Sequence, residues 1–300
     1  MAGATPVDIS DPLAMPSVAS LEQAYIVCER LARSHYENFN VVTGLLPRSL
    51  RRPMFAVYAF CRATDDLGDE APGDRLALLQ AWEEDLRRCY GDTPRHPYLI
   101  ALQDTVRTYD IPIKPFLKLI EANRMDQRVH RYRTYADLLH YCEHSANPVG
   151  RMVLYVFGHR DVECQRLSDC TCTALQLANF WQGVRQDYER GRIYLPLEDM
   201  ARYGCTEDAL ARGVLDGRFQ ALMRFEVERA RELFARGQAL VPMVSRDLRV
   251  DLKLFTLGGL AILDAIERQG YDVFSREPRV PKARRFWLVF RALVELWVGG

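Results

Sequence analysis

The sequence predicts an all-α protein, folded as a single-domain helical bundle around a central cavity. Apolar residues recur at intervals of three and four along most of the chain, which is the period of an amphipathic helix. The sequence contains no run of alternating β-branched residues and no internal repeat. A chain of 300 residues with 48% hydrophobic content can bury the core that such a bundle needs.

Eight segments carry this helical period. They cover residues 21–39, 51–70, 74–91, 97–110, 113–128, 134–158, 167–190 and 219–241. Proline or glycine marks the joints at Leu46-Pro47, Ala71-Pro72-Gly73, Asp92-Thr93-Pro94, Ile111-Pro112 and Leu195-Pro196. Because no linker-like stretch divides the chain, we expect a tail over residues 1–20, one helical domain over 21–275, and a basic segment with a C-terminal amphipathic helix over 276–300.

The composition narrows the classes of function. The 40 basic and 40 acidic residues give a net charge of zero, so we expect no nucleic-acid partner, since such proteins usually carry a basic face. The eight cysteines form no CxxC pair. Scattered cysteines of this kind are typical of buried thiols in a reducing cytosol, so we expect a cytoplasmic protein.

The termini predict no membrane span. The first twenty residues lack the basic and apolar regions of a signal peptide, and no apolar stretch reaches the roughly 20 residues that cross a bilayer. Residues 286–298 carry Arg291 and Glu295 on one helical face, which indicates an amphipathic helix. Four basic residues precede it, namely Arg279, Lys282, Arg284 and Arg285. This helix either makes peripheral contact with an anionic inner membrane surface or packs on the core, and both interpretations stay open.

An acidic cluster ends the segment over residues 51–70. Asp65 and Asp69 are four positions apart, so their carboxylates project from one helical face. Like charges at this spacing destabilise a helix, and Mg²⁺, which prefers oxygen ligands and often bridges to phosphates, compensates them well. Tyr58 and Arg62 precede the aspartates on the same side and suit a diphosphate leaving group. The alternative is a solvated helix end without a ligand.

A second constellation lies in the segment over residues 167–190. Asn179, Gly183 and Asp187 fall on one helical stripe, where an amide oxygen and a carboxylate can share a second Mg²⁺. Arg192 and Tyr194 follow this helix and are candidates to contact a phosphate. A polar stripe on a surface helix is the alternative.

Taken together, the two segments resemble the squalene/phytoene synthase family. The first motif is YAFCRATDDLGDE and the second is ANFWQGVRQDYERGRIYLP, with HYCEHSANPVG between them. The resemblance covers most of the chain from about Tyr25 onward. It implies an isoprenoid-synthase-type helical fold, a prenyl diphosphate substrate and Mg²⁺. The string ENFNVVTGLLPR, with Asn38-Phe39 where Ser-Phe is usual, resembles the hydroxysqualene synthase branch of hopanoid biosynthesis.

The resemblance also implies roles for single residues. The metal ligands would be Asp65, Asp69, Asn179 and Asp187. The catalytic residues would be Tyr58, Arg62 and Tyr141. The substrate would contact Asn38, Phe39, Arg62, Gln182, Arg192 and Tyr194. Candidates to face the carbocation are Phe39, Phe60 and Tyr141, and candidates for the base that activates water are His35, Tyr58 and Tyr141.

In the hydroxysqualene synthase branch, presqualene diphosphate loses diphosphate and water captures the cation, without a nicotinamide. This reaction implies a functional partnership with a presqualene diphosphate synthase. Two positions depart from the family pattern: Gly183 stands where the second motif has its first aspartate, and Gln182 where many members have arginine. The thinner second site favours a reaction on one diphosphate.

Three alternatives stay open. A presqualene diphosphate or phytoene synthase would condense two prenyl diphosphates. A non-catalytic homologue would only bind a prenyl diphosphate, since Gly183 removes a carboxylate. The string His140-Tyr141-Cys142-Glu143-His144 matches the H-x-x-E-H pattern of a zinc peptidase, which would leave both acidic segments unexplained.

Overall fold

The structure is a computed structural model that describes residues 18, 20–35 and 46–281. These residues form helices and contain no strand, only an isolated bridge between Arg131 and Ile193. The predicted all-α class is therefore confirmed. The described residues group into two compact units, the first up to Arg128 with residues 152–159, and the second over 129–151 and from Arg160 onward.

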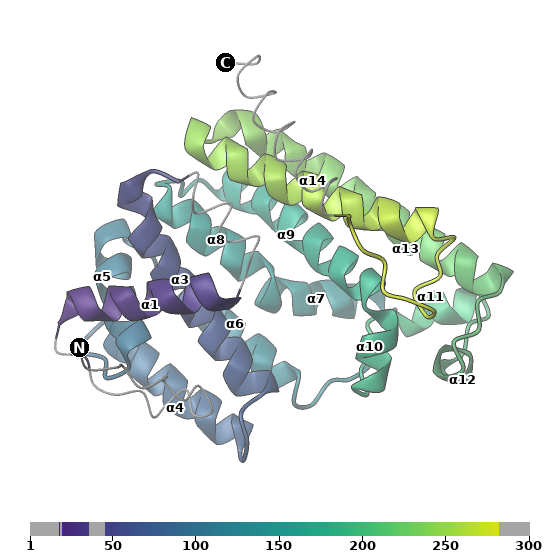
Figure 1. Cartoon of the computed structure of the whole chain (residues 1–300), viewed down its shortest axis with the longest axis horizontal. Coiled ribbons are helices and arrows are strands. Elements are labelled where there is room, and N and C mark those ends of the chain that lie inside the picture. The colour runs from purple at the N-terminus through teal and green to yellow at the C-terminus, as the bar shows by residue number, and fades with distance from the viewer. Residues whose placement is uncertain (1–17, 19, 36–45, 282–300) are drawn as a thin grey trace. The chain divides into compact units, whose positions relative to one another are not determined.

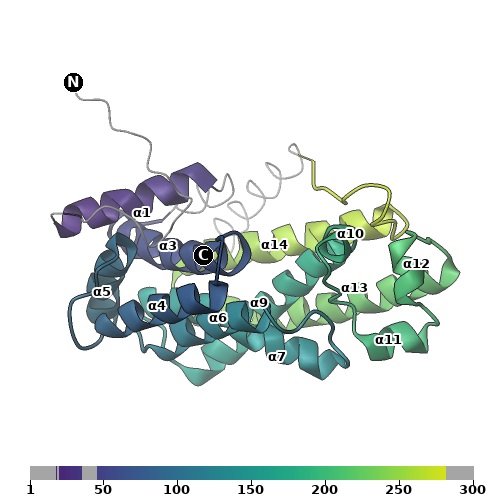
Figure 2. The same cartoon turned by 90° about the horizontal axis from the view of Figure 1, so that it is seen from below.

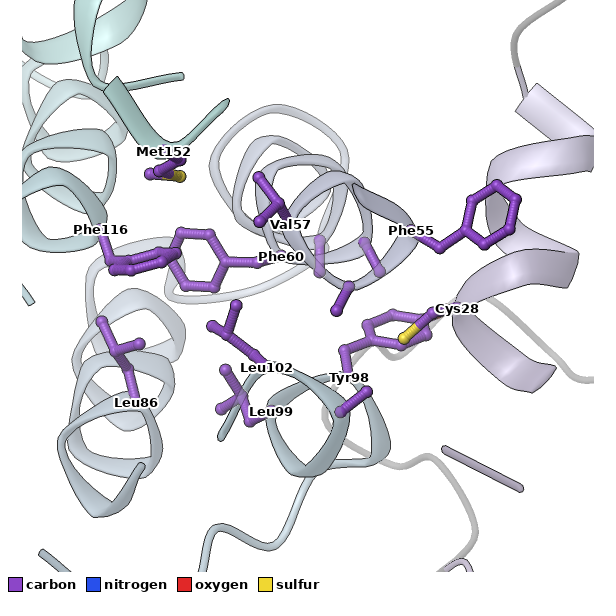
Figure 3. Packing of buried hydrophobic residues seen from close by; sticks show 14 of the residues in the cluster. Cys28, Phe55, Val57, Phe60, Leu86, Tyr98, Leu99, Leu102, Phe116 and Met152 are labelled. Atoms are coloured by element: carbon purple, nitrogen blue, oxygen red, sulfur yellow. The ribbon is translucent and has the colours of Figure 1, made fainter. Parts of the chain in front are cut away.

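The first unit is built from five helices and the end of a sixth (Figure 1). They are α1 (Leu21–His35), α3 (Arg48–Asp69), α4 (Arg75–Arg88), α5 (Pro97–Tyr109), α6 (Lys114–Met125) and the C-terminal part of α8 (Asn147–Val156). Phe60 of α3 lies at the centre of its core, edge to face with Phe116 at 5.0 Å between ring centroids (Figure 3). Trp82 stacks on Phe60 at 5.8 Å and donates from Nε1 to Thr64 Oγ1 at 2.9 Å. This packing holds α3, whose C-terminal end carries the first acidic motif.

The second unit is organised around three long helices that run alongside one another in Figure 1 and Figure 2. They are α9 (Val162–Gln182), α13 (Gly217–Gly237) and α14 (Arg246–Arg268). Its shorter elements are α7 (Tyr135–Ser145), α10 (Val184–Glu189), α11 (Leu197–Arg202), α12 (Glu207–Ala211) and the 3₁₀ helix η1 (Gln238–Met243). A Cβ on Gly237 would lie 2.1 Å from Thr171 Oγ1, and one on Gly259 would lie 2.3 Å from Phe234 Cζ. Glycine at these positions therefore permits close packing of the three helices.

Two predicted helices are interrupted in the structure. The segment over residues 134–158 divides at Ala146, and Pro148 occupies the first turn of the new helix α8, a position that suits proline. Buried Asn147 also accepts a hydrogen bond at Oδ1 from Thr173 Oγ1, at 2.9 Å. The segment over residues 167–190 begins earlier, at Val162, where Asp161 caps the helix, and it divides at Gly183.

Helix α14 was absent from the predicted set. Its paired glycines, Gly258 and Gly259, lower the helical propensity of the sequence, whereas packing of Gly259 against Phe234 stabilises the helix in the folded unit. The tail over residues 1–20 lies almost wholly outside the described residues, and so does the amphipathic helix expected at 286–298. All eight cysteines are free thiols and are buried or half-buried, as expected. Of the helices that the structure describes, none is both long enough and apolar enough to span a bilayer.

Candidate active site

The first motif lies at the C-terminal end of α3. Asp65 and Asp69 are exposed there, whereas Asp66 between them is buried. Tyr58 and Arg62, two turns and one turn earlier, are half-buried. The helix therefore presents two carboxylates a turn apart, as the spacing predicted. Carboxylate oxygens are donors that Mg²⁺ accepts, so the residues present fit this ion.

Arg62 is paired with carboxylates of its own helix. Its Nη2 lies 2.5 Å from Asp66 Oδ1 and 2.9 Å from Glu70 Oε1. These two carboxylates compensate the guanidinium within α3, and the pairing assigns Asp66 a structural role. A contact between Arg62 and a diphosphate stays a prediction, and it would compete with Glu70, whose side chain is 69% exposed.

Helix α6 supports the first motif through residues that the sequence analysis did not select. Asn123 donates from Nδ2 to Asp65 Oδ1 at 3.3 Å and to Leu119 O at 3.2 Å. Gln127, one turn later, donates from Nε2 to Gly68 O at 2.8 Å. In the sequence these two amides are only four residues apart on a predicted helix. That spacing does not show that they contact α3, because the packing of α6 against α3 is known only from the structure.

Gly68 of α3 lies directly against Asn123 of α6. A Cβ on Gly68 would lie 2.0 Å from Asn123 Oδ1 and 2.8 Å from Asn123 Cγ. Because Asn123 is 4% exposed, it has little room to move. A glycine between the aspartates therefore lets the amide of Asn123 reach Asp65.

We expect Gly68→Ala to destabilise the protein by about 1–3 kcal/mol, because the added methyl overpacks this contact. Urea unfolding monitored by circular dichroism measures the change. Gly258→Ala is the matched control, because a Cβ there meets nothing within 4 Å, and a helical alanine in open space stabilises by about 0.5–1 kcal/mol. Equal stability of the Gly68→Ala variant and the wild type would contradict this interpretation.

Burial and the neighbouring carboxylates of the first motif disfavour the charged form of Asp65. Although the Asp65 side chain reaches solvent, desolvation raises its pKa to about 7, and the charges of Asp69 and Asp66 add to the rise. The hydrogen bond from Asn123 and the charge of Arg62 lower the pKa only in part. An added cation would relieve this repulsion.

The second motif surrounds the junction of α9 and α10. Asn179 is exposed and Asp187 is half-buried. Although the helix is interrupted, the backbone keeps four-residue hydrogen bonds, from Gly183 N to Asn179 O and from Asp187 N to Gly183 O, each at 2.9 Å. Asn179, Gly183 and Asp187 therefore stay on one helical face, as predicted, although the helix is interrupted at Gly183. A Cβ on Gly183 would lie 3.2 Å from Asp187 Oδ2, so the carboxylate of Asp187 occupies space that a side chain at 183 would need.

A small pocket adjoins Asp187 in the second unit. Its lining includes Asp187, Arg192, Tyr194 and Phe180. Tyr194 stacks on Phe180 at 3.7 Å between centroids, and Tyr141 lies 5.9 Å from Tyr194. The structure therefore brings four residues selected from the sequence, Tyr141, Asp187, Arg192 and Tyr194, into one neighbourhood where aromatic rings adjoin a carboxylate and a cation.

Two residues selected from the sequence occupy other environments. Gln182 donates from Nε2 to Pro278 O at 2.6 Å, so its amide serves the backbone of its own chain, and its contact with substrate stays a prediction. Phe60 is fully buried in the core of the first unit. Its proposed place facing a carbocation is therefore wrong, and it has a packing role. Asn38 and Phe39 lie outside the described residues, as does the side chain of His35.

The H-x-x-E-H string does not gain a third ligand in the structure. His140 and His144 are edge to face at 4.6 Å between centroids, and His140 Nδ1 lies 3.8 Å from Glu143 Oε2. Within residues 20–35 and 46–281, no three His, Cys, Asp or Glu side chains gather as a metal site. This applies to the aspartates of α3 as well, whose cation would need oxygen atoms from water or substrate to complete its shell.

Comparisons with known proteins agree on one family. A family model described as squalene/phytoene synthase matches residues 32–284. The 15-cis-phytoene synthase of Synechococcus elongatus is 35% identical over 283 residues, which cover 90% of this chain and 92% of the relative. Phytoene synthase of Mycobacterium tuberculosis is 34% identical over 234 residues, with 76% and 77% covered.

Solved structures are similar over most of the chain. Squalene synthase HpnC from Alicyclobacillus acidocaldarius is 50% identical with a TM-score of 0.82, covering 84% of this chain and 96% of that one. A dehydrosqualene synthase in complex with ligand is 26% identical with a TM-score of 0.86, covering 93% and 98%.

Proposed function

Because this chain belongs to the squalene/phytoene synthase family, whose members process prenyl diphosphates, we propose that it converts presqualene diphosphate and water to hydroxysqualene and diphosphate. The observation that carries this choice is the composition of the second motif. Along the stripe of Asn179, Gly183 and Asp187 it offers one carboxylate, Asp187, and the amide of Gln182 is engaged by the backbone. A condensing synthase must manage two diphosphates, whereas this reaction releases one.

The residues of the two motifs have distinct tasks in this reaction. Asp65 and Asp69 are proposed Mg²⁺ ligands of the first motif, and Asn179 and Asp187 are proposed Mg²⁺ ligands of the second. When bound, Mg²⁺ neutralises the charge that develops on the departing diphosphate. Arg62 and Arg192 would add charge-assisted hydrogen bonds to the same group. These two arginines would contact the phosphate oxygens directly.

The bond changes balance without a redox cofactor. The C–O bond to the diphosphate breaks, and its electron pair leaves with the diphosphate. A water molecule then forms a new C–O bond to the rearranged cation and loses one proton. The rings of Tyr141, Phe180 and Tyr194 would stabilise the cation by roughly 0.5–2 kcal/mol each and would limit the access of bulk water.

A condensing synthase is the second candidate, because the curated relatives include phytoene synthases. Purified protein with Mg²⁺ and without NADPH should be incubated separately with presqualene, farnesyl and geranylgeranyl diphosphates, and the lipids identified by mass spectrometry. We expect a C30 alcohol from presqualene diphosphate alone. Presqualene diphosphate or phytoene as product would instead assign the condensing reaction. Binding without turnover of any substrate would assign the non-catalytic homologue.

The single carboxylate on the stripe of Asn179, Gly183 and Asp187 gives a further prediction. We expect Gly183→Asp to lower the Mg²⁺ concentration that half-saturates turnover relative to Gly183→Ala, because both variants crowd Asp187 but only the aspartate adds a ligand. Titration of turnover with Mg²⁺ measures the difference. If the two variants show the same Mg²⁺ dependence, the glycine at 183 does not weaken Mg²⁺ binding, and it no longer supports the reaction on one diphosphate.

A further inference from the structure

An irregular segment follows α14 in the second unit. We name residues 272–281 the C-terminal strap. Asp272 Oδ1 accepts hydrogen bonds from the backbone N–H groups of Phe274, at 3.0 Å, and Ser275, at 2.9 Å. The ring of Phe274 packs on Phe219 of α13 at 4.6 Å between centroids, and Pro278 is buried. The strap is thus an ordered, tightly held segment without regular secondary structure.

Side chains from two helices hold the carbonyl groups of the strap. From the α9–α10 junction, Gln182 Nε2 donates to Pro278 O and Arg185 Nη1 donates to Phe274 O, each at 2.6 Å. From the end of α14, Gln269 Nε2 donates to Arg276 O at 2.8 Å. The strap therefore connects the end of α14 to the junction that surrounds Gly183.

The junction needs such external support. Helix α10 has six residues, fewer than a helix needs to be stable on its own, and its N-cap residue Gly183 supplies no side-chain cap. Glycine also imposes the weakest restriction on the backbone. Beyond the backbone hydrogen bonds that continue from α9, the position of α10, and with it Asp187, therefore depends on contacts with other elements. Gln182 and Arg185 flank Gly183 and make such contacts.

We propose that Gln182 and Arg185 are positioning residues, which fasten the α9–α10 junction to the C-terminal strap and thereby fix the place of Asp187. This inference rests on the proposed function only in taking Asp187 as a metal ligand. The amide of Gln182 is a donor that matches the backbone carbonyl of Pro278. Arg185 also pairs through Nε with Glu189 Oε1 at 2.9 Å, which ties the strap to the far end of α10.

Hydrogen exchange of the full-length protein, free of metal and substrate, tests whether Gln182 and Arg185 hold the α9–α10 junction on the C-terminal strap. Gln182→Met removes the amide and keeps the length of the side chain. Loss of one such hydrogen bond should speed amide exchange in residues 184–193 and in the strap by roughly three- to tenfold. The double variant Gln182→Met with Arg185→Met should exchange faster still. Placing Arg185→Lys instead of Arg185→Met in this double variant should restore part of the protection.

Matched controls lie on the same helix, α9. The amide of Gln165 donates to Arg160 O at 3.4 Å, and Arg166 pairs with Glu163, both away from the strap. Gln165→Met and Arg166→Met should leave exchange in the junction and the strap unchanged. Exchange in α13 serves as an internal reference. If α13 accelerates to the same extent, Gln182 only stabilises the whole unit, and the proposal is overturned.

A kinetic readout tests the consequence for Asp187. We expect Gln182→Met to raise the half-saturating Mg²⁺ concentration with a smaller effect on kcat, because the ligand stays present but is held less firmly. Unchanged exchange in residues 184–193 would overturn the fastening whatever the substrate proves to be. Faster exchange together with an unchanged Mg²⁺ dependence would overturn the link to Asp187. Absence of turnover in the wild type would count against the proposed function and leave the exchange result valid.

Discussion

Asp65→Asn is expected to lower Mg²⁺-dependent turnover by roughly 100-fold or more, the scale of losing one preorganised electrostatic group in an active site. Asparagine keeps the shape of the side chain and removes the charge that attracts the cation. The carboxylate of Asp65 is exposed at the end of α3, whereas that of Asp66 is buried beside Arg62. Initial rates with presqualene diphosphate at saturating Mg²⁺ measure the effect.

The same substitution elsewhere in the first unit provides the control. Asp92 is exposed, and its carboxylate lies 3.6 Å from Arg88, far along the sequence from the motif. Asp92→Asn should keep wild-type turnover, because an exposed pair of this kind contributes at most about 1 kcal/mol to stability. If Asp65→Asn retained turnover within about threefold of the Asp92→Asn control, Asp65 would not be a metal ligand.

Glu226→Gln is expected to make the protein more stable at pH 8, by an amount on the order of a few kcal/mol. Glu226 is fully buried on α13. Its Oε2 lies 3.4 Å from Arg229 Nη1, which also lies 3.0 Å from Asp199 Oδ2. Two buried carboxylates therefore share one guanidinium, whose Cζ lies 3.8 Å from the centroid of the Tyr135 ring.

The sign of the pH dependence follows from the raised pKa. Burial raises the pKa of Glu226 to about 8, against the opposing charge of Arg229 and with the help of Asp199. Between the ordinary pKa of a glutamate and pH 8, the unfolded chain has lost this proton and the folded protein still holds it. The free energy of unfolding must therefore fall as pH rises through this window. Glutamine cannot ionise, so the free energy of unfolding of the variant does not fall with pH through this residue.

Urea unfolding at pH 5 and at pH 8 measures the difference. The stability of the variant relative to wild type should rise between the two pH values. Glu228→Gln is the control, because Glu228 is exposed on the same helix and pairs with Arg231, so its substitution should change little. A constant difference between Glu226→Gln and wild type at both pH values would show that Glu226 ionises normally in the folded protein.

The sequence by itself determined the class of fold and the helical faces from which the carboxylates project. Helical periodicity depends on local spacing, so α3, α5 and α6 were predicted within a few residues of their bounds. The four-residue spacing of Asp65 and Asp69 likewise fixed their shared helical face before any tertiary contact was known. The two motifs also sufficed to indicate the family, because both are short strings read directly from the chain.

The tertiary structure alone decided which side chains support those motifs. Asn123 reaches Asp65 from another helix, and Gln182 reaches Pro278 across nearly a hundred residues. Phe60 resembled a cavity aromatic in the sequence, but the packing of α3 on α4 and α6 buries it. Such contacts join residues that are distant in sequence, and their free energy comes from burial and hydrogen bonds that exist only after the helices pack. Periodicity and motif spacing carry no information about them.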